Sequence, residues 1–208
     1  MTKVYPNAAT AATSGDCDGY HQKQKTTSDA AVVMTVWKKS LLLNCHGFTV
    51  FDAKGNLVFR VDNYLSRHTK DDILLMDAAG TPLLTIRRKR VILGYKWVVY
   101  EGESTAKPQF WARKHLNILN SKCLITVNSP SNKKEGMVYA IEGSYAQRCC
   151  AVSNNERLVA EIKRKEAAVG GVTVGSDVFR LIVQPDTNTA FAMAFVILLD
   201  QMFGSSSR

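Results

Sequence analysis

The stretch AFAMAFVILL, residues 190–199, contains ten apolar residues without a break. A helix at a protein surface shows polar residues every third or fourth position, so a helix that is apolar all round must be enclosed. Ala, Met and Leu favour helix, and the side chain of Asp186 can cap the first free N–H groups. The sequence therefore predicts a helix over about residues 187–203 with the buried core residues Phe191, Met193, Phe195, Val196, Ile197, Leu198 and Leu199.

The length of this apolar stretch bears on what encloses it. As a helix, residues 190–199 span about 15 Å, half of the roughly 30 Å of a bilayer's hydrocarbon core. A membrane-associated segment is the alternative, but the length favours a helix enclosed by the rest of the chain.

The chain before this helix is typical of short strands separated by turns. Three similar hairpins are predicted, over residues 48–61, 73–88 and 149–163, with turns at 53–56, 78–81 and 154–156. Further strands are predicted at 32–37, 96–101, 109–115, 122–128, 137–142 and 178–184. This gives about twelve strands without βαβ alternation, which indicates antiparallel pairing.

An alignment of the three hairpins shows a common pattern of buried and exposed positions. Apolar residues coincide at Phe51, Met76 and Val152, and again at Val61, Ile86 and Ile162, whereas Arg60, Thr85 and Glu161 between them are polar. Alternation with a period of two places one face of each strand inward.

The number of strands explains how the terminal helix can be enclosed. Eight strands close on an interior that side chains can fill, so twelve leave a wider space. A helix is about 10 Å across and fits such a space. The sequence therefore predicts a mainly β domain over residues 30–208, a closed antiparallel barrel around its C-terminal helix, after a disordered tail over residues 1–29.

Composition limits the partners and the compartment. The net charge of +9 implies an anionic partner, such as a phosphoinositide membrane surface, nucleic acid or an acidic protein. Five cysteines without a CxxC pair favour reduced thiols, and no secretory signal is recognisable. We expect a monomer without a transmembrane span, in the cytoplasm, at the periphery of the plasma membrane or shuttling to the nucleus.

Motifs for catalysis and cofactor binding are not found in the sequence. It contains no GxSxG, no GxxxxGK[ST] and no HExxH, and its four histidines are scattered. These observations predict a protein that is not an enzyme and that holds no metal and no cofactor.

Two basic clusters are the candidate binding residues. Arg87, Arg88, Lys89 and Arg90 end the second hairpin, and Lys163, Arg164 and Lys165 end the third. Such clusters can bind the phosphate groups of anionic lipids through charge-assisted hydrogen bonds. The alternative is that they are solvated strand ends that keep the protein soluble.

Five segments in order resemble the plant LURP-one-related family. They are FTVFDAKGNLVFRV (48–61), LLMDAAGTPLLTIRRK (74–89), WVVYEG (97–102), IEGSYAQRCCAV (141–152) and FRLIVQPDTNTAFAMAFVILLD (179–200). The resemblance covers about residues 31–203. It implies the fold of tubby proteins and phospholipid scramblases, a link to plant defence against oomycetes, and a role like that of membrane-tethered transcription regulators.

The favoured hypothesis is a non-enzymatic module that binds phosphoinositides or other anionic lipids through the basic clusters. A nucleic-acid-associated transcriptional regulator is the alternative, although the sequence shows no motif for entering a groove. A scramblase-like, lipid-handling protein and an enzyme with a small ligand inside the barrel are further alternatives.

Overall fold

The computed structural model describes residues 30–41, 46–62, 72–92, 94–115, 123–129, 137–165 and 175–204. Within this part of the chain, twelve strands precede one helix, α1 (Thr189–Phe203). The strands are β1 (Val32–Trp37), β2 (Gly47–Phe51), β3 (Leu57–Asp62), β4 (Asp72–Asp77), β5 (Pro82–Val91), β6 (Gly94–Glu101), β7 (Pro108–Lys114), β8 (Cys123–Asn128), β9 (Met137–Ser144), β10 (Cys149–Asn154), β11 (Arg157–Arg164) and β12 (Val178–Val183). The tail predicted over residues 1–29 lies outside the described residues.

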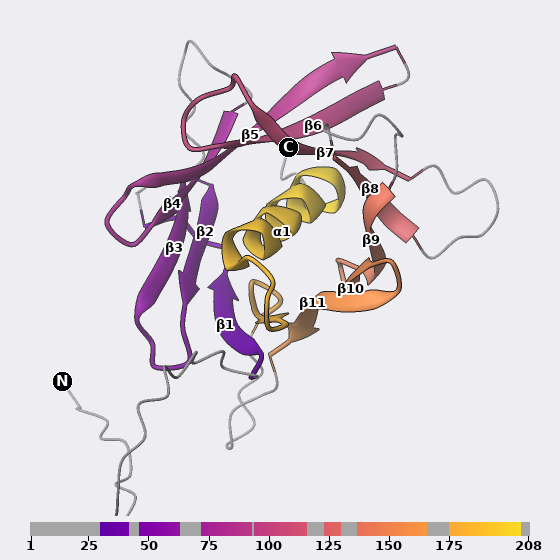
Figure 1. Ribbon diagram of the computed structural model, residues 1–208. Coiled ribbons are helices and arrows are strands. Elements are labelled where there is room, and N and C mark those ends of the chain that lie inside the picture. Colours follow the sequence, from indigo (N-terminus) through magenta and orange to yellow (C-terminus); the bar gives the residue numbers. More distant parts are fainter. Residues whose placement is uncertain are drawn as a thin grey trace, which may run out of the picture.

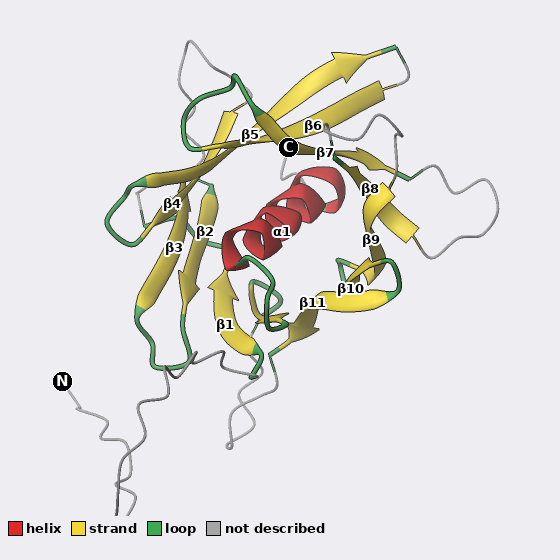
Figure 2. Ribbon diagram, viewed as in Figure 1, coloured by secondary structure: helices red, strands yellow, loops and turns green. Residues whose placement is uncertain are grey.

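The strands form a closed barrel. Each strand pairs antiparallel with its neighbours in the sequence, and β12 also pairs with β1, which closes the ring. The helix α1 lies inside this ring of strands (Figures 1 and 2). The predicted fold class, a closed antiparallel barrel around a C-terminal helix, is therefore confirmed.

The core of the barrel consists of α1 and the inward side chains of the strands. Residues 192–199 of α1 are all buried, and strand residues such as Val36, Val50 and Ile86 have no exposed surface. Of the predicted helix-core residues, Phe191 alone is half-buried, at the start of the helix. The described residues include no helix with the length and hydropathy needed to cross a bilayer.

The helix begins later than the sequence predicts, and its cap is a different residue. The side-chain oxygen of Asn188 accepts hydrogen bonds from the backbone N–H groups of Ala190 (2.9 Å) and Phe191 (3.2 Å). The predicted cap, Asp186, has a φ of 65° and lies in a turn. A hydrogen bond from the Thr187 N–H to the Gln184 carbonyl (3.2 Å) closes this turn. This turn delays the helix to Thr189, so the prediction of Asp186 as the cap is wrong.

The three hairpins are equivalent in register, with one difference. Their second strands align as predicted, because Val61, Ile86 and Ile162 pair with Phe48, Ile73 and Cys150. The first strands differ from the prediction. Val152 pairs with Ala160, and the equivalent pairs in the other two hairpins are Val50 with Phe59 and Leu75 with Leu84. The predicted alignment of Val152 with Phe51 and Met76 is wrong by one residue.

The turns explain this shift. The first two hairpins turn through Asp-x-x-Gly segments, in which Gly55 and Gly80 have positive φ. In the third hairpin, Asn155 and Glu156 have φ of 45° and 69°, and the strand residues Asn154 and Arg157 on either side pair directly. A shorter turn therefore replaces the longer one and moves the first strand by one position.

Candidate functional site

The barrel has two chemically different ends. Because all neighbouring strands are antiparallel, the odd-numbered strands finish at the same end. The C-terminus of α1 lies there too, since Asp200 pairs with Lys38, which follows β1, and Lys114 of β7 lies over the Phe203 ring. We call this the basic end; its described cations are Lys38, Lys39, Arg87, Arg88, Lys89, Arg90, Lys96, Arg113, Lys114, Arg148, Lys163, Arg164, Lys165 and Arg180.

We call the opposite end the turn end, because the turns of the hairpins and the start of α1 lie there. Its described acidic residues are Asp52, Asp77, Glu101, Glu103, Glu156 and Asp186. Its described cations are Lys54, Lys107 and Arg157, and all three are exposed. Described carboxylates lie at the basic end as well (Asp72, Glu142, Glu161, Asp177 and Asp200), but its cations outnumber them, so the net charges of the two ends have opposite sign.

The cluster on β5 is divided between two faces of the strand. Arg87 pairs with Asp72, its cross-strand neighbour on β4, with 2.6 Å between Nε and Oδ1. This hydrogen bond raises the pKa of the guanidinium above its usual value. On the other face, Arg88 lies 4.7 Å from the ring centre of Tyr95. Arg90 has no ion pair with any described residue.

The cluster on β11 has one engaged residue and two that are not. The Lys163 ammonium pairs with Glu161 two positions earlier on the same face of the strand (3.0 Å), in an exposed setting where such a pair contributes little. Arg164 is exposed and Lys165 half-buried, and neither pairs with a carboxylate among the described residues. This leaves Arg164 and Lys165 available for a partner.

The two clusters share the basic end but do not form one compact site. β5 and β11 run in the same direction and lie six positions apart in the ring of twelve strands. The clusters therefore stand on opposite sides of the barrel, where they can contact a broad anionic surface at the same time.

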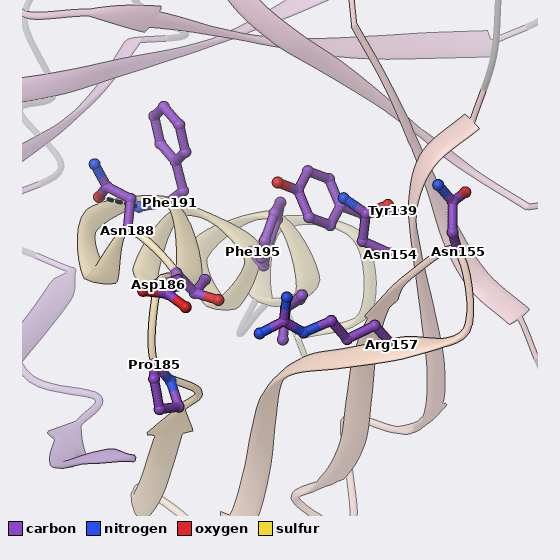
Figure 3. A pocket seen from close by; sticks show the side chains of 11 residues that line it. Tyr139, Asn154, Asn155, Arg157, Pro185, Asp186, Asn188, Phe191 and Phe195 are labelled. Carbon is purple, nitrogen blue, oxygen red and sulfur yellow. Dashed lines mark hydrogen bonds between the residues drawn. The ribbon is translucent and has the colours of Figure 1, made fainter. Parts of the chain in front are cut away.

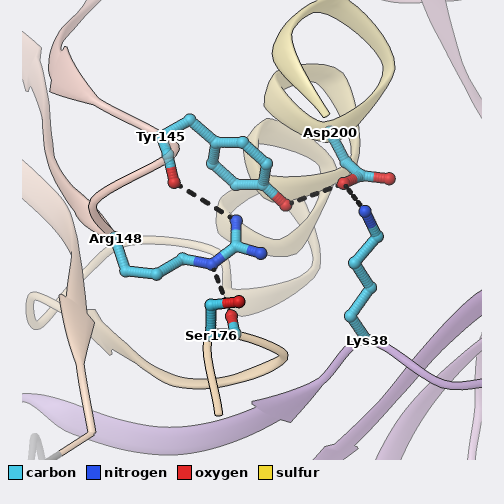
Figure 4. Close-up of polar contacts among 5 residues, drawn as sticks. All are labelled: Lys38, Tyr145, Arg148, Ser176 and Asp200. Carbon is cyan, nitrogen blue, oxygen red and sulfur yellow. Dashed lines mark hydrogen bonds and ion pairs between the residues drawn. The ribbon is translucent and has the colours of Figure 1, made fainter. Parts of the chain in front are cut away.

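Between the two clusters, a polar network fastens the C-terminus of α1 (Figure 4). The Asp200 carboxylate accepts a hydrogen bond from the Tyr145 hydroxyl (3.1 Å) and pairs with Lys38 (2.8 Å). Burial, and then the negative charge of Asp200, raise the pKa of Tyr145 far above its usual value. The network joins the helix to β1 and to the turn between β9 and β10.

Arg148 completes this network as a buried cation. Its Nε donates to the Ser176 carbonyl (2.9 Å) and its Nη1 to the Tyr145 carbonyl (3.3 Å). The guanidinium also lies over the rings of Tyr145 (4.2 Å) and Phe179 (4.5 Å). It is only 7% exposed, so its role is to hold the turn in place and not to bind a partner.

A pocket of about 560 Å³ opens at the turn end, beside the start of α1. Tyr139, Phe191 and Phe195 give it an apolar wall, and Figure 3 shows the side chains of Arg157 and Asp186 directed toward the same space. The sequence reasoning missed this pocket, because its residues come from three separate segments with no common motif.

The thiols of the described residues do not form a reactive or metal-binding site. Burial raises the pKa of Cys150 to about 11, and burial also raises the pKa of Cys123. Cys149, the residue before Cys150, is exposed. In the described part of the chain, no three His, Cys, Asp or Glu residues lie close enough to hold a metal ion.

Comparison with known proteins agrees with this architecture. A family model described as LURP-one-related matches residues 32–200. The chain belongs to the LURP-one-related family. Protein LURP-one-related 8 of Arabidopsis thaliana is 50% identical over 210 residues, which cover 99% of this chain and 100% of the relative. Protein LURP-one-related 17 of the same plant is 44% identical and covers 84% of each chain.

A solved structure shows the same fold. The X-ray structure of a protein from Arabidopsis thaliana superposes with a TM-score of 0.62 at 25% identity, covering 85% of this chain and 94% of that one. The names of the LURP-one-related relatives state a family and no reaction. The function of this LURP-one-related protein must therefore be inferred from its surface.

Proposed function

We propose that this LURP-one-related protein is a non-enzymatic binding module whose basic end docks reversibly on anionic phospholipid membranes, such as those that contain phosphoinositides. The observation that supports this proposal is the set of cations without carboxylate partners among the described residues: Arg90, Arg164 and Lys165. They lie on opposite sides of one end of the barrel, while the carboxylates of the turn end face away.

The magnitude of the attraction is sufficient for reversible docking. Each Lys or Arg near an anionic bilayer contributes about 1 kcal/mol, so three contribute about a hundredfold in affinity. Repulsion of the acidic turn end favours the orientation with the basic end toward the lipid. Release to the nucleus, as in tubby-like regulators, and a role in plant defence are part of the same proposal.

Membrane docking fits the surface better than the alternatives. Recognition of DNA commonly places a helix in the major groove, and α1, the single helix of the described residues, is buried in the barrel. A small substrate inside the barrel would compete with residues 192–199 of α1 for the same space.

Two charge-reversal variants with the same change in net charge test the proposal. The triple variant Arg90→Glu, Arg164→Glu, Lys165→Glu changes the basic end, and Lys54→Glu, Lys107→Glu, Arg157→Glu changes the turn end. Binding is measured by co-sedimentation with phosphatidylcholine vesicles that contain phosphatidylinositol bisphosphate, at low and high salt.

We expect the basic-end variant to lose about a hundredfold or more in affinity, and the turn-end variant to bind nearly as the unmodified chain does. Equal losses in both variants would mean that net charge alone attracts the protein, and would contradict the proposal. If double-stranded DNA displaces the protein from vesicles at equal phosphate concentration, the nucleic-acid alternative is favoured.

A further inference from the structure

The hairpin formed by β5 and β6 is longer than its neighbours. The two strands pair continuously as far as Val91 opposite Gly94. β4, however, pairs with β5 only as far as Arg87, and β7 pairs with β6 only as far as Trp97. Beyond these points the hairpin pairs with itself alone among the described residues, and Figure 1 shows it projecting from the barrel.

This projecting hairpin, residues 88–92 and 94–96, carries four cations, not all of which favour its own stability. Lys89 stands directly opposite Lys96, and like charges at such cross-strand positions are destabilising. A two-stranded hairpin without further contacts is marginally stable in water. Cation–π contacts offset part of this repulsion, because Arg88 lies over Tyr95, the Lys89 ammonium over Tyr100 (5.6 Å) and the Lys96 ammonium over Trp111 (4.8 Å). Arg90 has neither an ion pair nor a ring contact with a described residue, so its charge is better explained by an anionic partner than by folding.

The tip of the hairpin is apolar. Ile92 is fully exposed, the most exposed large hydrophobic side chain among the described residues, and Tyr95 is half-exposed just behind it. An isoleucine at the end of a projecting hairpin gains nothing from the barrel core. Arg90 on β5 and Lys96 on β6 lie between Ile92 and the barrel, so cations flank the apolar side chain at the tip.

We infer that the projecting hairpin is a membrane wedge: Ile92 enters the acyl-chain region of an anionic bilayer while Arg90, Lys96, Arg88 and Lys89 hold the lipid phosphates. The spacing fits, because Ile92 begins the turn after β5 and lies two residues beyond Arg90, at most about 7 Å away along an extended chain. The headgroup region of a bilayer is about 5–8 Å thick on each side. This inference rests on the proposed docking of the basic end and adds insertion to electrostatic attraction.

The experiment compares Ile92→Ser with Leu41→Ser, which removes another exposed apolar side chain at the same end of the barrel. Both full-length variants are tested for co-sedimentation with vesicles of phosphatidylcholine and phosphatidylinositol bisphosphate. A third variant, Ile92→Trp, is mixed with the same vesicles made from brominated lipid, and its fluorescence quenching is compared with that of the unmodified chain.

We expect Ile92→Ser to bind about tenfold more weakly, because membrane binding then removes less apolar surface of residue 92 from water. Leu41→Ser should bind as the unmodified chain does, and Ile92→Trp should show added quenching by bromine. Binding of Ile92→Ser at full strength, or a lack of added quenching in Ile92→Trp, would overturn the wedge and leave electrostatic docking intact. Failure of the unmodified chain to bind these vesicles even at low salt would overturn both.

Discussion

The two ends of the barrel use their charges differently. At the turn end, carboxylates stabilise the backbone of tight turns: Asp52 accepts from the N–H groups of Lys54 and Asn56, and Asp77 accepts from the Thr81 N–H. At the basic end, Arg87 and Lys38 have carboxylate partners, whereas Arg90 and Arg164 have none among the described residues. Charges at the turn end therefore serve folding, and part of the charge at the basic end remains for binding.

The same contrast appears in the ionisable groups. Hydrogen bonds lower the pKa values of Asp52 and Asp77 at the turn end. At the basic end, burial raises the pKa values of Tyr145 and Cys150. The two ends should therefore lose stability at opposite extremes of pH, so their contributions can be measured separately.

The largest effect is expected from removal of the helix that joins the two ends. Truncation before Thr187 deletes the buried residues 192–199, whose burial is worth on the order of 10 kcal/mol, as much as the whole stability of a typical domain. We expect the truncated chain to lose its cooperative unfolding transition, measured by circular dichroism during heating.

A deletion at the other terminus is the control for this truncation. Removal of residues 1–29, the tail predicted from the sequence, should leave the cooperative transition in place. A cooperative transition in the chain truncated before Thr187 would show that the barrel does not need its helix.

A smaller loss is expected from a substitution that releases the helix at the basic end alone. Asp200→Ala leaves the Lys38 ammonium and the buried Tyr145 hydroxyl without their shared acceptor, at a cost of about 2–3 kcal/mol. Asp200→Asn, the matched control, keeps an oxygen for Tyr145 and should cost less. Urea unfolding measures both; equal losses would assign the whole effect to the ion pair with Lys38.

The fold could be predicted from the sequence because its signals are local. Alternation with a period of two locates the strands, and the unbroken apolar run locates α1. The details that could not be predicted depend on competition between similar residues. Asp and Asn are both good N-cap residues, so the sequence alone does not distinguish Asp186 from Asn188. Asn188 is the cap because the turn from Gln184 to Thr187 contains Asp186 and delays the start of the helix.

The candidate site could be predicted only in part. Charge identifies the two clusters, and hairpin register could have shown that Asp72 faces Arg87. The projection of the hairpin beyond its neighbours depends on where the pairing of β4 and β7 ends, which no sequence pattern indicates. The pocket beside α1 depends in the same way on three segments that meet only in the folded barrel.

High pH should weaken the basic end. Cys150 has a pKa of about 11 in the folded protein against 9.0 for an ordinary thiol, so the unfolded chain releases its proton first. Stability is then fully present below about pH 9 and falls as pH rises toward 11, by about 1.4 kcal/mol at pH 10. Urea unfolding at pH 8 and pH 10 measures this loss.

Two variants of the adjacent cysteines show whether Cys150 causes the alkaline loss. Cys150→Ala should reduce the difference in stability between the two pH values, whereas Cys149→Ala, at an exposed position, should keep it. An identical difference in both variants would assign the alkaline sensitivity to other groups, with Tyr145 as the first candidate.

The smallest effect is expected at the turn end and at low pH. The Asn56 side chain and the Thr81 N–H lower the pKa values of Asp52 and Asp77 below the usual 3.8, so the unfolded state takes up protons first as the pH falls. Their contribution to stability is present above about pH 4 and is lost below it. The double variant Asp52→Asn, Asp77→Asn keeps acceptor oxygens but cannot titrate, so its stability should depend less on pH between 5 and 3 than that of the unmodified chain.

Glu103→Gln, at the same end but without a hydrogen bond from the described residues, is the control. Its stability should keep the full dependence on pH between 5 and 3, and its loss of stability at high pH should also be unchanged. If the double variant has the same acid dependence as the unmodified chain, the carboxylates of the turn end do not stabilise its turns, and the contrast between the two ends is limited to the sign of their charge.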